Sequence, residues 1–318
     1  MTQEKETSVY NMLTKLPIFK EVMEASEKTK GSIKVISFFT DKGGTGKTAN
    51  SYQIASFCAE VLNAKVLLID GDRSKNLTNR FGIQGKHTVN DLFKVDGDFA
   101  IYPTGKKNID IIIGDSKFTD KGTNSSEWST KYLEFYYWLG DNIDTLEQNY
   151  DYIIIDTHND VSQVTLSLLT PSDVIVSAVK PDPDSYDALY KYKEDVEEVL
   201  LAKTKIREGR GKQIRTAYDA TKLILANSVK FSGNNMHTTN KEFIAELEKF
   251  DNYIGLIPER DIFVESSLEN KSIFQLYDEL SESNSAKESK GEYVSHIAEI
   301  YLMIIYEACK KCLEKNLA

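Results

Sequence analysis

The chain has 318 residues, and its 39 lysines and arginines against 49 aspartates and glutamates give a formal net charge of −10. Hydrophobic residues at 41% and charged residues at 28% are typical of a globular protein and exclude a disordered or fibrous one. The acidic total argues against a protein coated in basic charge, but it allows a local basic patch.

The cysteines indicate a reducing compartment. Cys58, Cys309 and Cys312 are too few and too unevenly spaced for a disulfide framework. Cys309 and Cys312 have C-x-x-C spacing, but they fall in a helical pattern without a second pair. We therefore expect two cysteines on a helix face and not a redox or metal site. No stretch approaches the roughly 20 apolar residues that a membrane span needs.

In chain order, residues 1–31 are polar with a small apolar cluster, and they predict an N-terminal arm with one short helix that packs on the body or on a partner subunit. From residue 32 to residue 318 the pattern predicts a single domain. Its expected strands are residues 33–39, 66–70, 109–113, 152–156, 174–179, 223–226 and 253–257. Its expected helices are residues 47–62, 129–148, 185–203, 240–249 and 291–314, with polar loops at 208–215 and 281–291.

Continuous β-branched runs that alternate with amphipathic helices are typical of a mostly parallel sheet with helices on both faces. The predicted fold class is therefore doubly wound α/β. Ligands in such folds bind beyond the carboxyl ends of the strands.

The first strand runs directly into residues 40–48, with the sequence T-D-K-G-G-T-G-K-T, and a helix follows. A strand, a glycine-rich loop ending in G-K-T and a helix form the context of a P-loop. The glycines let backbone N–H groups turn toward phosphates, and the helix N-terminus adds partial positive charge. Lys47 is expected to reach the β- and γ-phosphates, and Thr48 to offer its hydroxyl to Mg²⁺. The expected nucleotide-binding segment is Lys42, Gly43, Gly44, Thr45, Gly46, Lys47, Thr48 and Ala49.

Carboxylates follow two of the expected strands. Asp70 and Asp72 lie at i and i+2, so they can face the same way at the end of strand 66–70. Asp156 ends strand 152–156, and we expect it to hold Mg²⁺ through water. These carboxylates suit magnesium contacts and the orientation of an attacking water. His158 is either a loop residue with a structural hydrogen bond or a contact of the γ-phosphate region.

Together these motifs resemble the ParA family of plasmid and chromosome partition ATPases, within the deviant Walker A NTPases of the ParA/MinD superfamily. The form K-G-G-x-G-K-T carries the resemblance, with Lys42 at the start of the loop and Asp41 where the general P-loop has glycine. The resemblance implies that Lys42 reaches across a dimer interface to the nucleotide of the other subunit. It also implies magnesium contacts by Thr48, Asp70 and Asp156, and the catalytic set Lys42, Lys47 and Asp72, in which Asp72 positions or activates the water.

The chain departs from the family at two places. Arg73-Ser74 follows Asp72, where the family often has Pro-Gln. His158-Asn159 follows the strand that ends at Asp156, where the family usually has small residues such as Pro-Pro.

Adenine contacts are also implied by the resemblance. Residues 223–227 are similar to the family strand whose final asparagine contacts the base, which assigns this role to Asn227. Residues 257–261 are similar to the segment beside it, which makes Pro258 a wall of the base site. An amide both donates and accepts, as the adenine edge requires. We see no guanine-selecting N-K-x-D, so ATP is expected over GTP.

A basic cluster interrupts the acidic chain between residues 203 and 215. In the family, an ATP-bound dimer joined face to face over the nucleotide binds DNA without sequence preference through basic surface residues. A ParB-like centromere-binding partner stimulates its slow hydrolysis. DNA binding of this kind weakens steeply with salt. The candidate DNA-binding residues are Lys203, Lys205, Arg207, Arg210, Lys212 and Arg215, to which Lys310, Lys311 and Lys315 could add.

Two alternatives share the same ATPase site: a MinD-like membrane-cycling ATPase and a ParA-like ATPase that positions another cargo. The last predicted helix carries a broad apolar stripe that is typical of core packing and not of a separate amphipathic tail. We therefore expect no membrane partner and a cytoplasmic protein that associates with the nucleoid when bound to ATP. The stripe is Val294, Ile297, Ile300, Tyr301, Ile304, Ile305 and Ala308.

Overall fold

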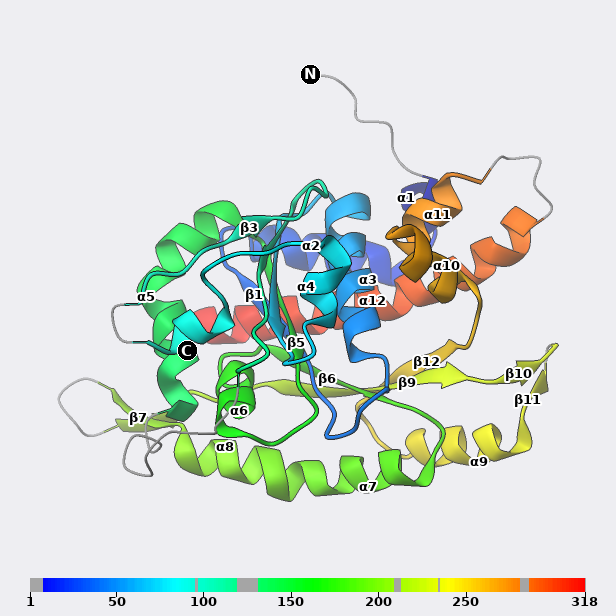
Figure 1. Ribbon diagram of the computed structural model, residues 1–318. Coiled ribbons are helices and arrows are strands. Elements are labelled where there is room, and N and C mark those ends of the chain that lie inside the picture. The colour runs from blue at the N-terminus through cyan, green and yellow to red at the C-terminus, as the bar shows by residue number, and fades with distance from the viewer. Residues whose placement is uncertain are drawn as a thin grey trace.

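The computed structural model describes residues 8–94, 97–118, 131–208, 213–233, 235–280 and 286–317. Its centre is an eight-stranded sheet in the order β12-β9-β6-β1-β5-β2-β4-β3 (Figure 1). Every pairing in it is parallel except that of β3 with β4. The strands of this sheet are β1 (Lys34–Phe38), β2 (Val66–Gly71), β3 (Tyr102–Pro103), β4 (Ile109–Ile112), β5 (Tyr152–Thr157), β6 (Val174–Val179), β9 (Thr221–Val229) and β12 (Tyr253–Pro258).

Helices cover both faces of the sheet (Figure 1). The first face packs against α1 (Ser8–Leu13), α2 (Pro17–Lys28), α3 (Lys47–Ser56), α11 (Ile273–Asp278) and α12 (Ala286–Leu317). The second face packs against α5 (Glu134–Asn149), α6 (Gln163–Leu169), α7 (Pro183–Tyr192), α8 (Glu198–Lys203) and α9 (Thr238–Leu247). Ile154 of β5 belongs to the first core, whereas its neighbours Ile153 and Ile155 belong to the second. This alternation along one strand confirms the doubly wound α/β fold.

Shorter elements join these layers. The predicted helix 47–62 is α3 followed by the π-helical turn η1 (Phe57–Val61), and the predicted helix 185–203 contains a similar turn, η4 (Lys193–Glu197), between α7 and α8. Two hairpins lie outside the main sheet: β7 (Lys205–Glu208) with β8 (Gln213–Thr216), and β10 (Phe231–Ser232) with β11 (Asn235–Met236). The remaining helices are α4 (Asn76–Phe81), η2 (Val89–Phe93), η3 (Lys131–Leu133) and α10 (Ile262–Glu269).

The N-terminal segment forms two helices and not the single one expected. Pro17 is the first residue of α2. An N–H at this position has no partner within a helix, so proline costs no hydrogen bond there. Val9, Leu13 and Val22 are fully buried in the first core, and α2 packs along α12. The division into an arm at 1–31 and a domain at 32–318 stays a prediction, but residues 8–28 share the core of the rest.

Two predicted loops are wrong where the structure describes them. Residues 205–208 and 213–216 pair as an antiparallel hairpin, with Arg207 opposite Ile214, and residues 209–212 lie outside the described part. Residues 286–291 begin α12. Gly291 indicated a loop, yet it lies inside the helix. A Cβ at this position would come within 2.9 Å of the Tyr277 hydroxyl, so the close approach of α11 favours glycine there.

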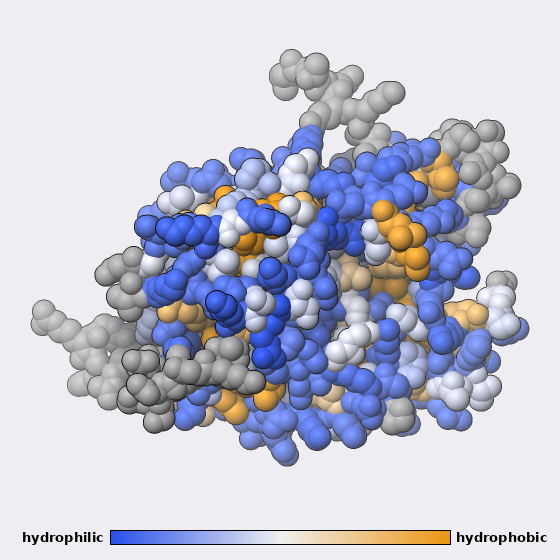
Figure 2. Space-filling model, in the orientation of Figure 1, coloured by the Kyte–Doolittle hydropathy of each residue, from blue (hydrophilic) through white to orange (hydrophobic). Residues whose placement is uncertain are grey.

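The stripe on α12 is buried as predicted: all seven of its residues are at most 1% exposed. Cys58, Cys309 and Cys312 are buried free thiols. No described helix is long and apolar enough to cross a membrane. On the face shown in Figure 2 most of the surface is hydrophilic, and hydrophobic atoms gather over α10, where Val264 and Leu268 are exposed.

Integration of the N-terminal helices can be tested by unfolding. Leu13→Ala should lower the free energy of unfolding by about 2–5 kcal/mol, because it removes a fully buried side chain from the first core. Urea titration measures the change. The control is Asn11→Ala on the exposed side of α1, which should stay within about 0.5 kcal/mol of the parent. Equal small effects would mean that α1 is not part of the cooperative core.

Candidate nucleotide-binding and catalytic site

The glycine-rich loop, residues 40–46, connects β1 to α3 and lies at the carboxyl ends of the parallel strands. Gly44 and Gly46 have φ angles of 73° and 95°, in the left-handed region that favours glycine. Gly46 is the N-cap of α3, and a Cβ on it would come within 2.0 Å of the Asn227 side-chain nitrogen. Two effects therefore disfavour a side chain at this position: strain in the left-handed backbone conformation and a clash with Asn227.

Lys47, the first residue of α3, is 6% exposed and folds back over the loop. Its Nζ donates to the carbonyl oxygens of Thr40 at 3.3 Å and Lys42 at 3.1 Å. Burial lowers the pKa of Lys47, and the nearby carboxylates of Asp156 and Asp72 oppose that shift. The ammonium group is thus held where it can exchange weak carbonyl contacts for phosphate oxygens.

Asp70 and Asp156 lie opposite each other in the register of β2 and β5, and both are fully buried. Asp70 Oδ2 accepts hydrogen bonds from the backbone nitrogen and hydroxyl of Thr78, at 2.7 and 2.6 Å. Burial raises the pKa of Asp70 to about 6, although the Thr78 hydrogen bonds lower it. Burial and the charge of Asp70 also raise the pKa of Asp156.

Two buried polar atoms at this site have no hydrogen-bond partner within the described part of the chain: Thr45 Oγ1 and Asp156 Oδ2. The other oxygen of Asp156 accepts from the Ser51 hydroxyl at 3.4 Å, and Thr48 also hydrogen-bonds this carboxylate. An unsatisfied buried carboxylate oxygen costs free energy that a cation or its bound water would recover. Thr48 and Asp156 therefore fit a magnesium ion. No group of three His, Cys, Asp or Glu side chains suited to a metal occurs among the described residues.

Asp72 is the centre of a small polar network. Its Oδ1 accepts from the backbone nitrogen of Ser74 and from Nδ1 of His158, each at 2.8 Å. An ionised carboxylate only accepts, so this contact places the imidazole proton on Nδ1. The two segments that depart from the family pattern are therefore in contact. His158 contacts Asp72, and Arg73 forms an ion pair with Asp160 at 3.0 Å.

Lys42 lies at the mouth of the loop and contacts its own chain. Its Nζ forms ion pairs with Asp182 and, at 3.1 Å, with Asp184, both at the N-terminus of α7. The hydrogen bond that Lys42 donates to Asp182 raises the pKa of Lys42. Asp182 is also the N-cap of α7 and accepts from Ser185 N at 3.0 Å. Sequence analysis missed both aspartates, although D-P-D-S after a strand has the pattern of a helix N-cap.

The two predicted base-site residues lie at the ends of neighbouring strands, β9 and β12. Asn227 is 7% exposed, and its amide donates to the Thr45 carbonyl oxygen at 2.7 Å, so it braces the P-loop. Pro258 is the last residue of β12, and its carbonyl oxygen accepts from the Tyr293 hydroxyl at 2.8 Å. A base contact for either residue stays a prediction.

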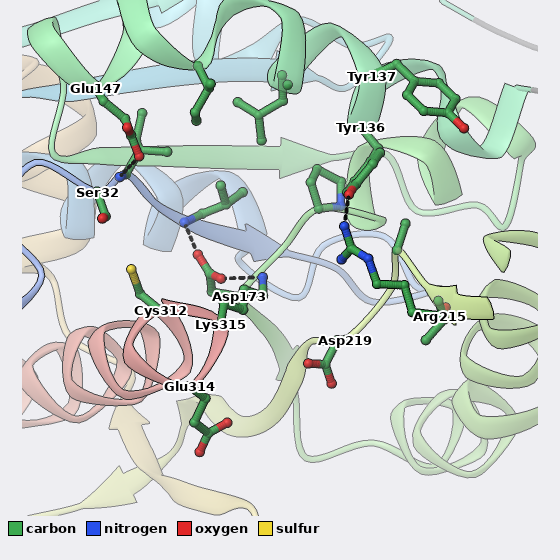
Figure 3. A pocket seen from close by; sticks show the side chains of 18 of the residues that line it. Ser32, Tyr136, Tyr137, Glu147, Asp173, Arg215, Asp219, Cys312, Glu314 and Lys315 are labelled. Atoms are coloured by element: carbon green, nitrogen blue, oxygen red, sulfur yellow. Dashed lines mark hydrogen bonds and ion pairs between the residues drawn. The ribbon is translucent and has the colours of Figure 1, made fainter. Parts of the chain in front are cut away.

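The predicted DNA-binding residues lie on another part of the molecule. Arg210 and Lys212 are outside the described residues, whereas Lys203 ends α8 and Lys205 and Arg207 lie on β7. Arg215 on β8 donates to the Tyr136 hydroxyl at 3.1 Å (Figure 3). The hairpin precedes β9, so it lies toward the amino ends of the strands, away from the P-loop.

The C-terminal lysines of α12 that could have added to this cluster form ion pairs, one within the helix and two with residues outside it. Lys310 pairs with Glu307, Lys311 with Asp219 and Lys315 with Asp173. Their charges are therefore largely compensated.

A glycine loop between β1 and α3, with a buried lysine and the carboxylates of β2 and β5 beside it, defines a P-loop nucleotide-binding protein. A family model described as an AAA domain matches residues 33–207, more than half of the chain. The virulence plasmid ParA family protein pGP5-D of Chlamydia psittaci is 32% identical over 171 residues, which are 51% of this chain and 62% of that protein. The sporulation initiation inhibitor protein Soj of Bacillus subtilis is 30% identical over 152 residues, 46% of this chain and 58% of Soj.

The chain belongs to the ParA family of the ParA/MinD P-loop ATPases. Its match spans about 60% of the length of these two curated relatives. Solved structures share the fold. An ATP complex of a Cyanothece McdA variant has a TM-score of 0.66 at 18% identity and covers 83% of this chain and 95% of its own. A plasmid partition protein from Borrelia burgdorferi has a TM-score of 0.57 at 21% identity and covers 86% and 97%.

The buried carboxylates predict a pH dependence of stability. Without magnesium or nucleotide, the free energy of unfolding should fall as the pH rises from about 4 to about 6. The folded-state pKa of Asp70, about 6, exceeds the usual 3.8, so the folded protein binds more protons in this window. Two pKa units correspond to about 3 kcal/mol. Urea titrations in EDTA measure the slope, and Asp70→Asn should flatten it. Equal slopes in both proteins would contradict the prediction.

Proposed function

We propose that the protein is a ParA-type DNA partition ATPase. Two subunits joined face to face over Mg-ATP would bind DNA without sequence preference, and a ParB-like centromere-binding partner would stimulate slow hydrolysis that releases them. The protein would be cytoplasmic and associated with the nucleoid while ATP is bound. One observation carries the proposal: Lys42 lies at the mouth of a P-loop that also brings Lys47, Asp72 and Asp156 together. Family membership and the fold shared with plasmid partition proteins support it.

Each residue would have a distinct role. The loop N–H groups and Lys47 would hold the β- and γ-phosphates. Magnesium, held by Thr48 and by Asp156 through water, would neutralise charge on those phosphates. Asp70 would contact the magnesium ion through a water molecule and not directly. One of its oxygens already accepts two hydrogen bonds from Thr78. Asp72, oriented by His158 and Ser74, would position the attacking water.

Removal of Asp72 separates binding from turnover. Asp72→Ala should lower ATP hydrolysis by about a hundredfold or more and should accumulate an ATP-bound dimer, because binding residues stay in place. Phosphate release and light scattering measure the two effects. Lys47→Ala is the contrasting variant and should lose ATP binding, and with it the dimer. Normal turnover in Asp72→Ala, or tight ATP binding in Lys47→Ala, would refute the corresponding role.

For Lys42 to act in the other subunit, it must leave Asp182 and Asp184. Asp182→Asn keeps a good helix cap and removes one of the charges that hold Lys42. A partly exposed ion pair contributes up to about 1 kcal/mol, so half-maximal dimerisation should need about two- to fivefold less ATP. Sedimentation across an ATP series measures it.

The matched control is Asp187→Asn, which removes an exposed charge from the same helix. An equal shift in both variants, or none in either, would mean that the Asp182 contact does not restrain Lys42.

In this proposal the hairpin β7–β8 would form the DNA-binding surface. A dimer that closes over the carboxyl ends of the strands would carry its two hairpins on outer surfaces, toward the amino ends. Arg215→Ala and Lys205→Ala should each weaken binding to random duplex and reduce the slope of log affinity against log salt by about one. Lys20→Ala, on α2 of the opposite face, should change neither.

The titrations are repeated with ATP, with ADP and without nucleotide. Binding that does not depend on ATP would contradict the partition proposal. Binding to anionic liposomes in place of DNA would favour the MinD-like alternative.

A further inference from the structure

A second hollow lies on the outer side of α5, apart from the nucleotide site. It has a volume of about 390 Å³ and is formed by residues of η2 and α5 together with Lys94, Gly97 and Phe99. Its lining is rich in aromatic rings and carboxylates, and Lys94 is the only cation among the described lining residues. The residues that matter are Phe93, Phe99, Glu134, Tyr137, Trp138 and Asp141.

The rings in this hollow are held in fixed orientations. Trp138 stacks on Phe135 with ring centroids 5.5 Å apart, and Phe99 meets Trp138 edge to face at 5.1 Å. Aromatic faces attract cations through their quadrupoles, and the planar guanidinium of arginine stacks on them better than an ammonium group does. The walls therefore favour a flat cationic group.

Two residues that line the hollow each have a buried polar atom without a hydrogen-bond partner in the described part of the chain, Glu134 Oε2 and Trp138 Nε1. The first is an acceptor and the second a donor. A ligand would reach them after a small shift of these side chains. Leaving such atoms unpaired is costly, so a group that pairs with both gains free energy on binding. Nearby cations do not supply the pairing: Lys94 is bound to Asp91, and the charge of Lys131 lowers the pKa of Glu134 without a hydrogen bond to Oε2. Burial has the larger effect and raises the pKa of Glu134, as expected of a carboxyl group without a close cation.

We propose that this hollow binds an arginine side chain on a segment of a partner protein. The guanidinium would donate to Glu134 and lie against the aromatic walls, and a backbone carbonyl of the same segment would accept from Trp138 Nε1. A free cation offers no acceptor for the indole, whereas a peptide offers both groups. The site is distinct from the P-loop and takes neither nucleotide nor DNA.

The surface around the hollow fits a basic segment longer than one residue. Tyr137 and Asp141 line this hollow and also a cavity of about 930 Å³ on the other side of α5 (Figure 3). That cavity carries further carboxylates, including Glu147, Asp219 and Glu314, which outnumber the cations Arg215 and Lys315 in the same lining. A peptide anchored by arginine can therefore extend over α5 along a surface of complementary charge.

The test uses the indole of Trp138 as its probe. The sequence has two tryptophans, so Trp128→Phe in the full chain leaves Trp138 as the only indole N–H signal in a ¹H–¹⁵N spectrum. Titration with the peptide acetyl-Gly-Arg-Gly-amide should shift this signal saturably, with a dissociation constant of about millimolar or tighter. The citrulline peptide, which has the same shape without the charge, should bind at least about tenfold more weakly.

Variants of the hollow complete the test. Glu134→Gln should weaken arginine-peptide binding at least about tenfold, and Phe99→Leu, which removes a ring while staying apolar, should also weaken it. Glu147→Gln on the same helix lies outside the hollow and should bind as the parent does. The dispersion of each spectrum checks that the variant is folded.

The proposal is overturned if the Trp138 signal does not shift saturably. Equal binding of the arginine and citrulline peptides would overturn it too, as would unchanged binding in Glu134→Gln and Phe99→Leu. Each result is independent of ATP binding and hydrolysis, so it leaves the proposed function untouched.

Discussion

The position of β5 between β1 and β2 is the constraint on which the site depends. These strands are parallel and in register, so Phe38 of β1 pairs with Asp156 of β5, which pairs with Asp70 of β2. Their carboxyl ends therefore meet where the P-loop leaves β1. The sheet forces two carboxylates into one buried space, and each disfavours the ionisation of the other. The buried ammonium group of Lys47 opposes this effect and lowers the pKa of Asp156.

Much of this architecture could be predicted from the sequence because its signals are local. The runs at 152–156 and 174–179 are continuous and β-branched, and such runs predict buried parallel strands. The short elements α4, α6, α10 and α11 were missed, since six to eight residues carry too little periodicity. Gly291 misled the prediction for a different reason: it is a glycine because Tyr277 of another helix packs closely against it, and not because the chain turns there.

The candidate site, like the fold, could be predicted only where its residues are close together in the sequence. Residues 40–48 are contiguous, so their sequence alone predicted the P-loop. The restraint on Lys42 joins residues 140 positions apart, and no local pattern links them. The contact of His158 with Asp72 likewise joins the segment after β5 to the segment after β2. The ion pair of Arg73 with Asp160 joins the same two segments. The two departures from the family are 84 or more positions apart in the sequence, but in space their segments are in contact.

The last helix imposes an order on how the molecule is made. α12 covers β1, β6 and β9 and holds α1 and α2, all of which leave the ribosome long before it does. Until α12 emerges, the apolar face that includes Ile36, Val176 and Leu225 lacks its cover. Exposed apolar surface of this kind promotes aggregation. This face of the sheet is therefore covered only after residues 286–317 have been synthesised, so its exposure during folding lasts until α12 has formed.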